Sequence, residues 1–429
     1  MNATNSLLNF IKYATSPFHV VNKSISILKE HGFQHLDLGT KWTLKKGGCY
    51  YTKVYDSTLI AFVIGEHLSN TPMLRLAAAH TDFPCFKVKP NAAITEKNYV
   101  KLNTETYGGA ILNTWLDRPL SIAGKVSLKS DSVFHPRICF IDFNQNLLTI
   151  PNLAIHMNRD INKGKELNKQ TELLPLIATL NDTLKKDDFF INYLASKMNV
   201  RVTDILDYDF YIYNKEEGCT LGIDQSFISA PRLDNLTSVY GLLTGITASQ
   251  LNPNALHCIA LYDNEEIGSH TKQGADSIIM NFILEKIFDS LNKSKTTLFN
   301  SISKSVLLSA DVAHGYHPNY SSKSDLTNKP CLNHGIAIKI NANQKYASDT
   351  EAIAIVQQLC QKYNIPYQKY VNRSDMIGGS TLGSITSSWL PMKTVDLGIP
   401  LLAMHSAREL MGTSDQNTLN RLMEAFFKE

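Results

Sequence analysis

The sequence lacks the features that mark secreted, membrane-spanning and thiolate-zinc proteins. Its seven cysteines are odd in number and no two are two residues apart, which argues against a disulfide framework and a Cys-x-x-Cys zinc site. No apolar run approaches the roughly 18 residues that a membrane span needs. The N-terminus has no signal-peptide core. We therefore predict a reducing, cytoplasmic location and no membrane partner.

An excess of charge and a nucleotide-binding loop are also missing. The formal net charge is only +3 over 429 residues, which gives no reason to expect nucleic acid as a partner. Neither a G-x-G-x-x-G nor a Walker pattern occurs, so a nucleotide cofactor is not expected. What the chain does have is 43% hydrophobic residues and a length that predicts two domains or one domain with a large insertion.

Short apolar runs alternate with helical patterns near the start of the chain and again from residue 228 onward. Residues 17–31 have helical spacing, whereas "STLIAFVIG" and "TPMLRLAAAH" are typical of buried strands. This alternation predicts an α/β fold with a mostly parallel sheet covered by helices on both faces. Residues 91–227 contain short strand patterns and a long polar stretch. We predict one domain from residues 1–90 and 228–429, interrupted by a mostly β insertion at 91–227.

Two adjacent glutamates, Glu265 and Glu266, follow the apolar run "CIALYDN". Neighbouring side chains on an extended backbone point to opposite faces, so we expect each carboxylate to have its own task. The chain also contains Glu216 and Glu217, in the polar stretch "NKEEGC", and we expect no apolar strand before this pair. That second pair is predicted to be a surface turn.

Several polar residues share the property of following a predicted buried strand. Because ligand sites in open α/β sheets gather at the carboxyl ends of strands, such residues can converge. Two imidazoles and four carboxylates suit a divalent metal such as zinc, manganese or cobalt. The residues in question are His80, Asp234, Glu265, Glu266, Asp311 and His405.

Each of these residues also has a structural interpretation. Asp82 shares a face with His80 and could hold its ring as an outer carboxylate, or it could cap a turn. Asp234 in "RLDN" could be a helix N-cap, and Asp311 could be a turn residue.

Six segments together resemble the M18 family of metallo-aminopeptidases, the aspartyl aminopeptidases. The resemblance extends over essentially the whole chain, with the segments in family order. They are "AAAHTDFPCFKVKP", "APRLDNLTSVYGLL", "DNEEIGSHTKQGADS", "SADVAHGYHPNY", "IKINANQKYASD" and "LLAMHSARE". The resemblance implies a zinc-peptidase-type α/β domain with a mixed sheet, split by a dimerisation domain, and a homo-oligomer built from dimers, expected to be a dodecamer.

The resemblance also implies two divalent metal ions, with zinc expected first and manganese or cobalt as alternatives. His80 and Asp311 would bind one ion, Glu266 and His405 the other, and Asp234 would bridge both. Glu265 would be the general base beside the metal-held water, with Asp82 next to this machinery. The peptide bond after Asp234 would be strained.

For the substrate, the resemblance implies contacts with His314, Lys339 and Tyr346, and with His156 of a neighbouring subunit. Lys339 could instead be a solvated strand lysine, Tyr346 ordinary packing and His156 a surface residue. Asp375 and Gly379 are expected to give the pocket its shape only. The expected activity is removal of an N-terminal residue, preferably Asp or Glu. A broader aminopeptidase, a deacylase or carboxypeptidase on the same scaffold, and a non-catalytic scaffold protein are the alternatives.

Overall fold

The computed structural model describes residues 2–180 and 189–429. Contacts divide the chain into two compact units. The first consists of residues up to Asp82, residues 218–404 and residues 409–429, and the second of residues 83–217 with the short segment 405–408. The boundaries predicted for the insertion, 91 and 227, lie further along the chain than those of the second unit.

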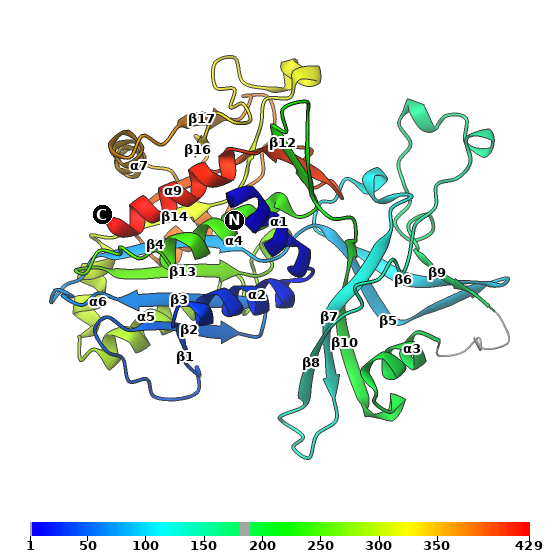
Figure 1. Cartoon of the computed structure of the whole chain (residues 1–429), viewed down its shortest axis with the longest axis horizontal. Coiled ribbons are helices and arrows are strands. Elements are labelled where there is room, and N and C mark those ends of the chain that lie inside the picture. Colours follow the sequence, from blue (N-terminus) through cyan, green and yellow to red (C-terminus); the bar gives the residue numbers. More distant parts are fainter. Residues whose placement is uncertain (1, 181–188) are drawn as a thin grey trace. The chain divides into compact units, whose positions relative to one another are not determined.

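A nine-stranded mixed sheet forms the centre of the first unit (Figure 1). The strands β13, β4, β14 and β18 run parallel to one another, whereas β2–β3, β3–β13 and β18–β16 pair antiparallel. In spatial order the strands are β1 (Gln34–His35), β2 (Cys49–Val54), β3 (Thr58–Ile64), β13 (Leu256–Tyr262), β4 (Leu74–His80), β14 (Val306–Ala310), β18 (Lys393–Gly398), β16 (Ile336–Ile340) and β17 (Tyr367–Val371).

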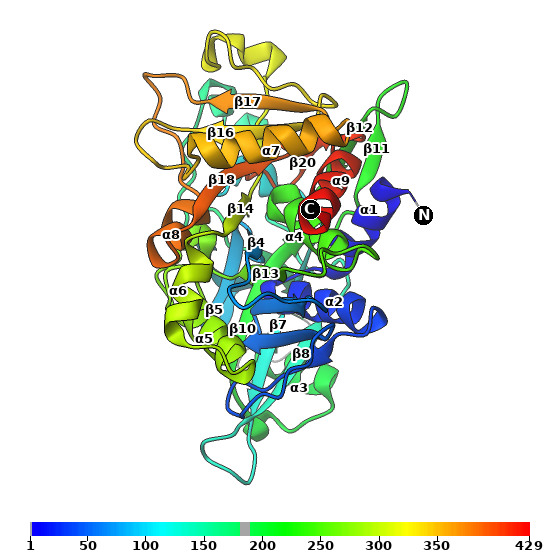
Figure 2. The ribbon, with the colours of Figure 1, turned by 90° about the vertical axis from the view of Figure 1, so that its left-hand side faces the viewer.

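Helices cover both faces of this sheet. Figure 2 shows α5, α6 and α8 on one side of the strands and α2, α4 and α9 on the other. Such burial from both sides explains why β3, β4 and β13 are nearly continuous apolar runs. The helices of this unit are α1 (Ala3–Tyr13), α2 (Pro17–Glu30), α4 (Leu233–Ile246), α5 (Ile279–Ser290), α6 (Lys295–Ile302), α7 (Thr350–Lys362), α8 (Leu382–Trp389) and α9 (Asp415–Lys428).

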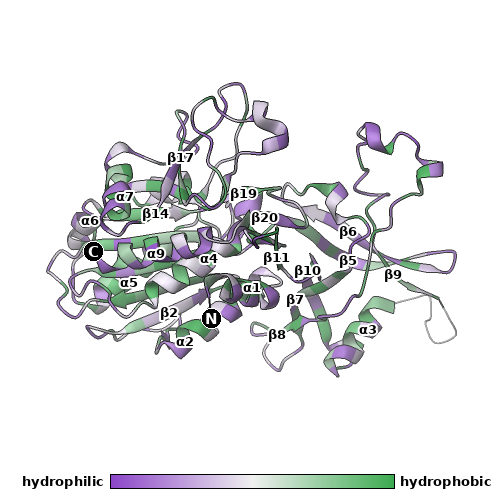
Figure 3. Cartoon of the chain, turned by 45° about the horizontal axis from the view of Figure 1, so that its top comes forward, coloured by the Kyte–Doolittle hydropathy of each residue, from purple (hydrophilic) through white to green (hydrophobic). Residues whose placement is uncertain are grey.

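The helices at the surface are amphipathic. Along α7 and α9, hydrophobic and hydrophilic residues alternate with helical spacing, and Figure 3 shows both colours on each helix. The apolar side of α9 packs on α4, which in turn packs against β4 and β13. No helix among the described residues is long and apolar enough to cross a membrane.

A smaller sheet in the same unit carries the segments that lead into and out of the candidate site. Its order is β11 (Cys219–Leu221), β12 (Phe227–Ala230), β20 (Glu409–Gly412), β19 (Pro400–Leu402) and β15 (Ala313–His314). The apolar stretch "TVDLGIPLLAMHS" does not form one continuous strand. It forms two, β18 in the large sheet and β19 in the small one, separated by Ile399.

The second unit is mostly β, as the sequence predicted. Its six-stranded sheet is antiparallel, and the helix α3 (Phe189–Met198) contributes Phe190 to an aromatic core with Phe210 and Tyr208. The sheet order is β8 (Arg137–Asp142), β7 (Leu120–Leu128), β10 (Ile205–Asn214), β5 (Cys85–Glu96), β6 (Tyr99–Tyr107) and β9 (Leu176–Thr179). Short 3₁₀ turns occur at 112–115, 155–157, 161–163 and 202–204. The end of the long polar stretch, 181–188, lies outside the described residues.

Candidate metal centre

Three neighbouring parallel strands bring their carboxyl ends to one edge of the large sheet. His80 is the last residue of β4 and lies in register with Tyr262, the last residue of β13. Asp311 directly follows β14, the strand on the other side of β4. His80 and Asp311 therefore lie at the carboxyl ends of neighbouring parallel strands, as the sequence predicts.

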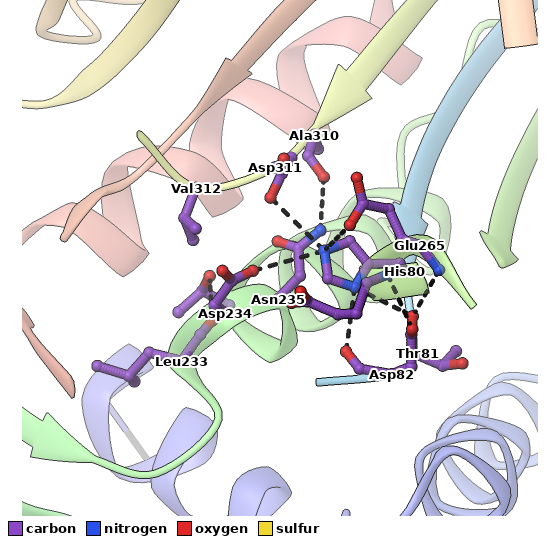
Figure 4. Close-up of polar contacts among 12 residues, drawn as sticks. His80, Thr81, Asp82, Leu233, Asp234, Asn235, Glu265, Ala310, Asp311 and Val312 are labelled. Carbon is purple, nitrogen blue, oxygen red and sulfur yellow. Dashed lines mark hydrogen bonds and ion pairs between the residues drawn. The ribbon is translucent and has the colours of Figure 1, made fainter. Parts of the chain in front are cut away.

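The His80 ring is buried and oriented by Asp82. Its Nδ1 lies 3.0 Å from the Asp82 carbonyl oxygen and 3.3 Å from the carboxylate atom Oδ1. A carbonyl oxygen can only accept, so Nδ1 carries a hydrogen, and in the neutral ring Nε2 has the lone pair. Figure 4 shows Nε2 facing carboxylates from three other segments. It lies 3.4 Å from Asp234 Oδ1, 3.6 Å from Asp311 Oδ1 and 4.0 Å from Glu265 Oε2.

These separations fit a metal ion better than direct hydrogen bonds. A charge-assisted N–H···O bond is about 2.7–2.9 Å long, which is shorter than the distances from Nε2 to Asp234 and Asp311. By contrast, zinc bonds of about 2.0–2.2 Å at tetrahedral angles place neighbouring ligand atoms about 3.3–3.6 Å apart. One nitrogen and two carboxylate oxygens are also a donor set that zinc accepts. His80, Asp234 and Asp311 therefore suit one zinc ion.

The glutamate pair does not lie on an extended strand. β13 ends at Tyr262, Asn264 takes a left-handed conformation with φ of 64°, and Glu265 begins a 3₁₀ turn, η5 (Glu265–Ile267). The expectation that the two side chains point to opposite faces of a strand is therefore wrong. Instead, both glutamates have a carboxylate oxygen within 4.8 Å of a ring nitrogen of His80. A 3₁₀ turn can direct consecutive side chains to one region, which a strand cannot.

Asp82 also fixes the backbone of this turn. Its Oδ1 accepts the Glu265 N–H and its Oδ2 accepts the Glu266 N–H, both at 3.1 Å. The carboxylate is fully buried. One side chain thus positions a histidine and both glutamates, which goes beyond the ring-holding role predicted for it. The alternative of a simple turn cap does not describe these contacts.

Asp234 stands at the start of α4 but does not cap that helix. The N-cap is Arg232, and Asp234 itself has non-helical angles. The peptide bond from Asp234 to Asn235 is cis. The Asp234 N–H donates to Glu409 Oε2 at 3.0 Å, and Asn235 Nδ2 donates to the Ala310 carbonyl oxygen at 2.9 Å.

Those two hydrogen bonds fasten the Asp234 turn to β20 and to the end of β14. Glu409 was not recognised from the sequence. Its carboxylate is only 2% exposed in β20 and needs a partner, but this burial is visible only in the folded chain.

Lys339 on β16 is buried rather than solvated. Its side chain is 2% exposed, and Nζ donates to Asp311 Oδ2 at 3.2 Å and to the Val312 carbonyl oxygen at 3.0 Å. The Tyr346 ring lies beneath the ammonium, with Nζ 5.1 Å from the ring centroid. The alternative of a solvent-facing lysine is therefore excluded. The pairing with Asp311 was not foreseen, because it depends on which residue faces Lys339 in space.

The concentration of carboxylates sets the electrostatics of the protein without bound cations. Burial disfavours charge on His80, but the carboxylates of Asp234, Asp311 and Asp82 outweigh it and hold its pKa well above the usual value. Burial, together with the neighbouring carboxylates, raises the pKa of Glu265 to about 8. The pKa of Asp311 is lowered, because Lys339 and His80 outweigh its burial. A region with several buried carboxylates and one lysine attracts divalent cations.

The predicted substrate residues of the first unit lie on adjoining segments. Tyr346 is buried and donates its hydroxyl to Asn372 Oδ1 at 3.3 Å, and its ring centroid is 6.2 Å from that of Tyr370. His314, at the end of β15, is exposed, with its ring 5.9 Å from Tyr370. His314, Tyr370 and Asn372 line a cavity of about 220 Å³. Asp375 is exposed and forms an ion pair with Arg373.

The other two predicted residues belong to the second unit. His156 lies in the 3₁₀ turn η2 (Ile155–Met157) and is exposed. His405 has a φ of 67°, and its Nδ1 lies 3.1 Å from the Gly109 carbonyl oxygen of the same unit. As for His80, a carbonyl partner on Nδ1 means that Nε2 carries the lone pair of this imidazole.

Comparisons with known proteins agree over the length of the chain. A family model described as "Aminopeptidase I zinc metalloprotease (M18)" matches residues 10–427. A relative from Clostridium novyi (strain NT), named "Probable M18 family aminopeptidase 2", is 44% identical over 424 residues, which cover 99% of this chain and 98% of the relative.

Solved structures have the same fold. The cryo-EM structure of the Ape4 and Nbr1 complex contains a chain that is 32% identical, with a TM-score of 0.95, covering 99% of this chain and 85% of that one. The structure of the mApe1 dodecamer of S. cerevisiae is 26% identical, with a TM-score of 0.87, covering 99% of this chain and 96% of that one.

Proposed function

The chain belongs to the M18 family of zinc aminopeptidases, and we propose that it removes the N-terminal residue of peptides with two divalent ions at the edge of the large sheet. The observation that supports this most directly is the set of distances around His80. They suit a zinc ion held by His80, Asp234 and Asp311. For the second ion we propose Glu266, Asp234 as the shared ligand, and His405 through its Nε2.

The proposed chemistry is hydrolysis with Glu265 as the general base. Bound zinc ions supply a water of lowered pKa and polarise the scissile carbonyl. Support for this role is that Glu265 Oε2 lies near a proposed zinc ligand, 4.0 Å from His80 Nε2, and that Asp82 holds its backbone. It would take the proton of the attacking water and deliver it to the leaving amine. Asp82 is a positioning residue in this scheme, because it acts through His80 and the glutamates.

Metal removal tests the metal-dependent part of the proposal. Chelation should abolish hydrolysis, and adding back zinc, manganese or cobalt should restore it, with elemental analysis giving the number of ions per chain. Two ions per active chain is the expected result. Full activity in protein shown to be free of metal, or saturation of activity at one ion, would contradict the two-metal proposal.

We further propose a preference for N-terminal Asp or Glu, with Lys339, Tyr346 and His314 contacting the substrate. A buried carboxylate requires a positive charge, and Lys339 has one of its three N–H donors beyond the two used by Asp311 and Val312. Lys339→Met should lower kcat/KM for aspartyl and glutamyl peptides far more than for alanyl or leucyl peptides. Loss of one partner of a desolvated charge pair costs roughly 2–5 kcal/mol.

The same substrate panel separates the alternatives. Lysyl or neutral preference in the wild type would favour a broader aminopeptidase, and cleavage of N-acylated substrates would favour a deacylase. Lys339→Met could also disturb Asp311, so its metal content must be measured. Equal loss on all substrates together with lost metal would assign Lys339 to the metal site alone.

For assembly, we propose a homo-oligomer built from dimers, in which His156 enters the site of a neighbouring subunit. The support is the dodecameric structure of the related mApe1 and the exposure of His156 on a short turn. Mixing His156→Ala chains with Glu265→Gln chains should restore part of the activity, because some interfaces then hold one intact site. No recovery despite proven subunit exchange would mean that His156 serves its own subunit or none. The cytoplasmic location stays a prediction.

A further inference from the structure

A second buried carboxylate stands opposite Lys339. Asp396 lies in the middle of β18, is fully buried, and is the antiparallel register partner of Lys339 on β16. Directly opposed residues of antiparallel strands project to the same face, so the carboxylate and the ammonium side chain share one face of the sheet. Burial raises the pKa of Asp396, and the charge of Lys339 acts against this rise.

Hydrogen bonds fix the Asp396 carboxylate to two segments. Its Oδ2 accepts the Ala347 N–H and its Oδ1 accepts the Thr381 hydroxyl, both at 2.6 Å. Ala347 follows Tyr346, the ring beneath the Lys339 ammonium. A side chain at Gly383 would not fit here, because a Cβ atom would lie 2.6 Å from Asp396 Oδ2. Each oxygen of the carboxylate therefore has a hydrogen-bond donor from a different segment.

The charges around Lys339 do not cancel. One ammonium interacts with two buried carboxylates: it pairs directly with Asp311, and its charge also acts on Asp396, its register partner on β18. Asp311 is the carboxylate that we assign to a metal ion, whereas nothing in the proposed metal chemistry involves Asp396. When ionised, Asp396 therefore reduces the net positive charge that a substrate carboxylate would meet at Lys339.

We propose that Asp396 is a specificity-determining residue, which limits how strongly the Lys339 region favours an acidic N-terminal residue over a neutral one. The inference rests on the proposed aminopeptidase function and concerns its selectivity. Asp396 touches neither substrate nor metal. It acts through the ammonium of Lys339 and through the position of the Tyr346 segment.

Asp396→Asn is the variant that isolates the charge. The amide oxygen can still accept the Ala347 N–H, and the amide nitrogen can donate to the Thr381 oxygen, so the hydrogen-bonded shape is kept. Removing one negative charge should raise the ratio of kcat/KM for aspartyl over alanyl peptides. Coulomb's law gives about 3- to 30-fold for unit charges about 8 Å apart at effective dielectric constants of about 20–60. The change should reside mainly in KM, and the affinity for free L-aspartate, measured by calorimetry, should rise while that for L-leucine stays unchanged.

Thr381→Val is the matched control. It removes one hydrogen bond to the same carboxylate but leaves the charge in place. It should lower the melting temperature, and the aspartyl-to-alanyl ratio of kcat/KM should stay at the wild-type value. A merely structural role of Asp396 predicts instead that both variants lose stability and that the aspartyl-to-alanyl ratio of kcat/KM stays unchanged in Asp396→Asn as well.

The outcomes separate this inference from the function on which it rests. No hydrolysis of any free-amine peptide by the zinc-loaded wild type would refute the aminopeptidase function itself. Wild-type activity with an unchanged or lowered ratio in Asp396→Asn would overturn the role of Asp396 alone. A raised ratio supports it even if the wild type shows no acidic preference. If Asp396→Asn does not fold, Asp396→Ser removes the same charge with a smaller side chain. Its aspartyl-to-alanyl ratio of kcat/KM is then compared with that of the wild type.

Discussion

Glu216–Glu217 and Glu265–Glu266 are the same dipeptide in two different surroundings. The expectation that no apolar strand precedes the first pair is wrong, because β10 ends at Asn214 with five buried residues. In the first pair, Glu216 accepts from Arg118 Nη1 at 2.6 Å and from Asn214 Nδ2 at 3.2 Å, and Glu217 is exposed. The second pair begins a 3₁₀ turn whose two backbone N–H groups are held by one buried carboxylate, that of Asp82.

The two surroundings move the pKa of a glutamate in opposite directions. Partial burial raises the pKa of Glu216, but Arg118 and Asn214 outweigh it, and the result is a lowered value. Burial and three neighbouring carboxylates raise the pKa of Glu265 to about 8. A glutamate beside an arginine is a stable anion and an ordinary surface ion pair. Without bound cations, a glutamate among carboxylates keeps its proton to a higher pH than an ordinary surface glutamate does.

The largest expected effect is on the second pair. Glu265→Gln keeps the shape of the side chain but removes the proton acceptor, so kcat should fall by about 100- to 10,000-fold. Zinc content, measured by elemental analysis, should stay at the wild-type level, because Glu265 is assigned to the water and not to a metal ion. Glu217→Gln is the matched control and should retain full activity. A Glu265→Gln enzyme that loses zinc would reverse the assignment of the two glutamates.

The neighbouring glutamate should respond differently. Glu266→Gln replaces a proposed anionic ligand with a neutral amide, so the affinity for one of the two ions should drop by more than about 100-fold, beyond the loss expected for an outer partner. Titration of chelated protein with zinc would show one site weakened and one retained. Activity should return in part at high zinc concentration, which Glu265→Gln should not allow. If high zinc restored the activity of Glu265→Gln and Glu266→Gln equally, the assignment of Glu265 to the water and Glu266 to a metal ion would be wrong.

Asp82 holds the backbone of Glu265 and Glu266, and the Glu216–Glu217 pair is held differently. Substituting Asp82 should therefore make the Glu265–Glu266 pair less well ordered. Asp82→Asn places an NH₂ group against an N–H donor of Glu265 or Glu266 and weakens the hold on His80. Loss of such an outer partner typically costs about 10- to 100-fold in metal affinity or activity. The measurement is zinc affinity alongside melting temperature in chelator. Lower stability with unchanged zinc affinity would leave Asp82 a structural role only.

The strand-end residues of the site were predictable because their signal is local. His80 and Asp311 each end an apolar run, and parallel strands bring such ends together. The conformation of the glutamate pair was not predictable, because it depends on the left-handed Asn264 and on Asp82, which is far away in sequence. The sequence argument assumed that the strand continues beyond Tyr262 and therefore expected the Glu265 and Glu266 side chains on opposite faces. The chain instead turns after Tyr262.

Residues whose role depends on a partner across the sheet were missed or only half described. Asp396 lies inside the apolar run "TVDLGIPLL", and a carboxylate at such a place signals a buried partner without identifying it. Lys339 was singled out through the family resemblance, yet its pairing with Asp311 follows from the register of β16 with β18 and the position of β14. The pairing of β16 with β18 and of β14 with β18 joins segments that are far apart in the sequence, so no single segment predicts either register.

The smallest expected effect concerns the first pair. Glu216→Gln removes the charge from an ion pair with Arg118 whose side chains are 35% and 32% exposed. Exposed pairs contribute about 0–1 kcal/mol, so the free energy of unfolding should fall by no more than that, with zinc content and kcat unchanged. Because the folded-state pKa of Glu216 is lowered, its stabilisation is present above the ordinary value for glutamate and is lost as the pH falls through the lowered one. Denaturant unfolding of both proteins at several pH values would show the two curves converging in acid. A difference that grows as the pH falls, or any loss of zinc, would mean that this pair is not the plain surface counterpart of Glu265–Glu266.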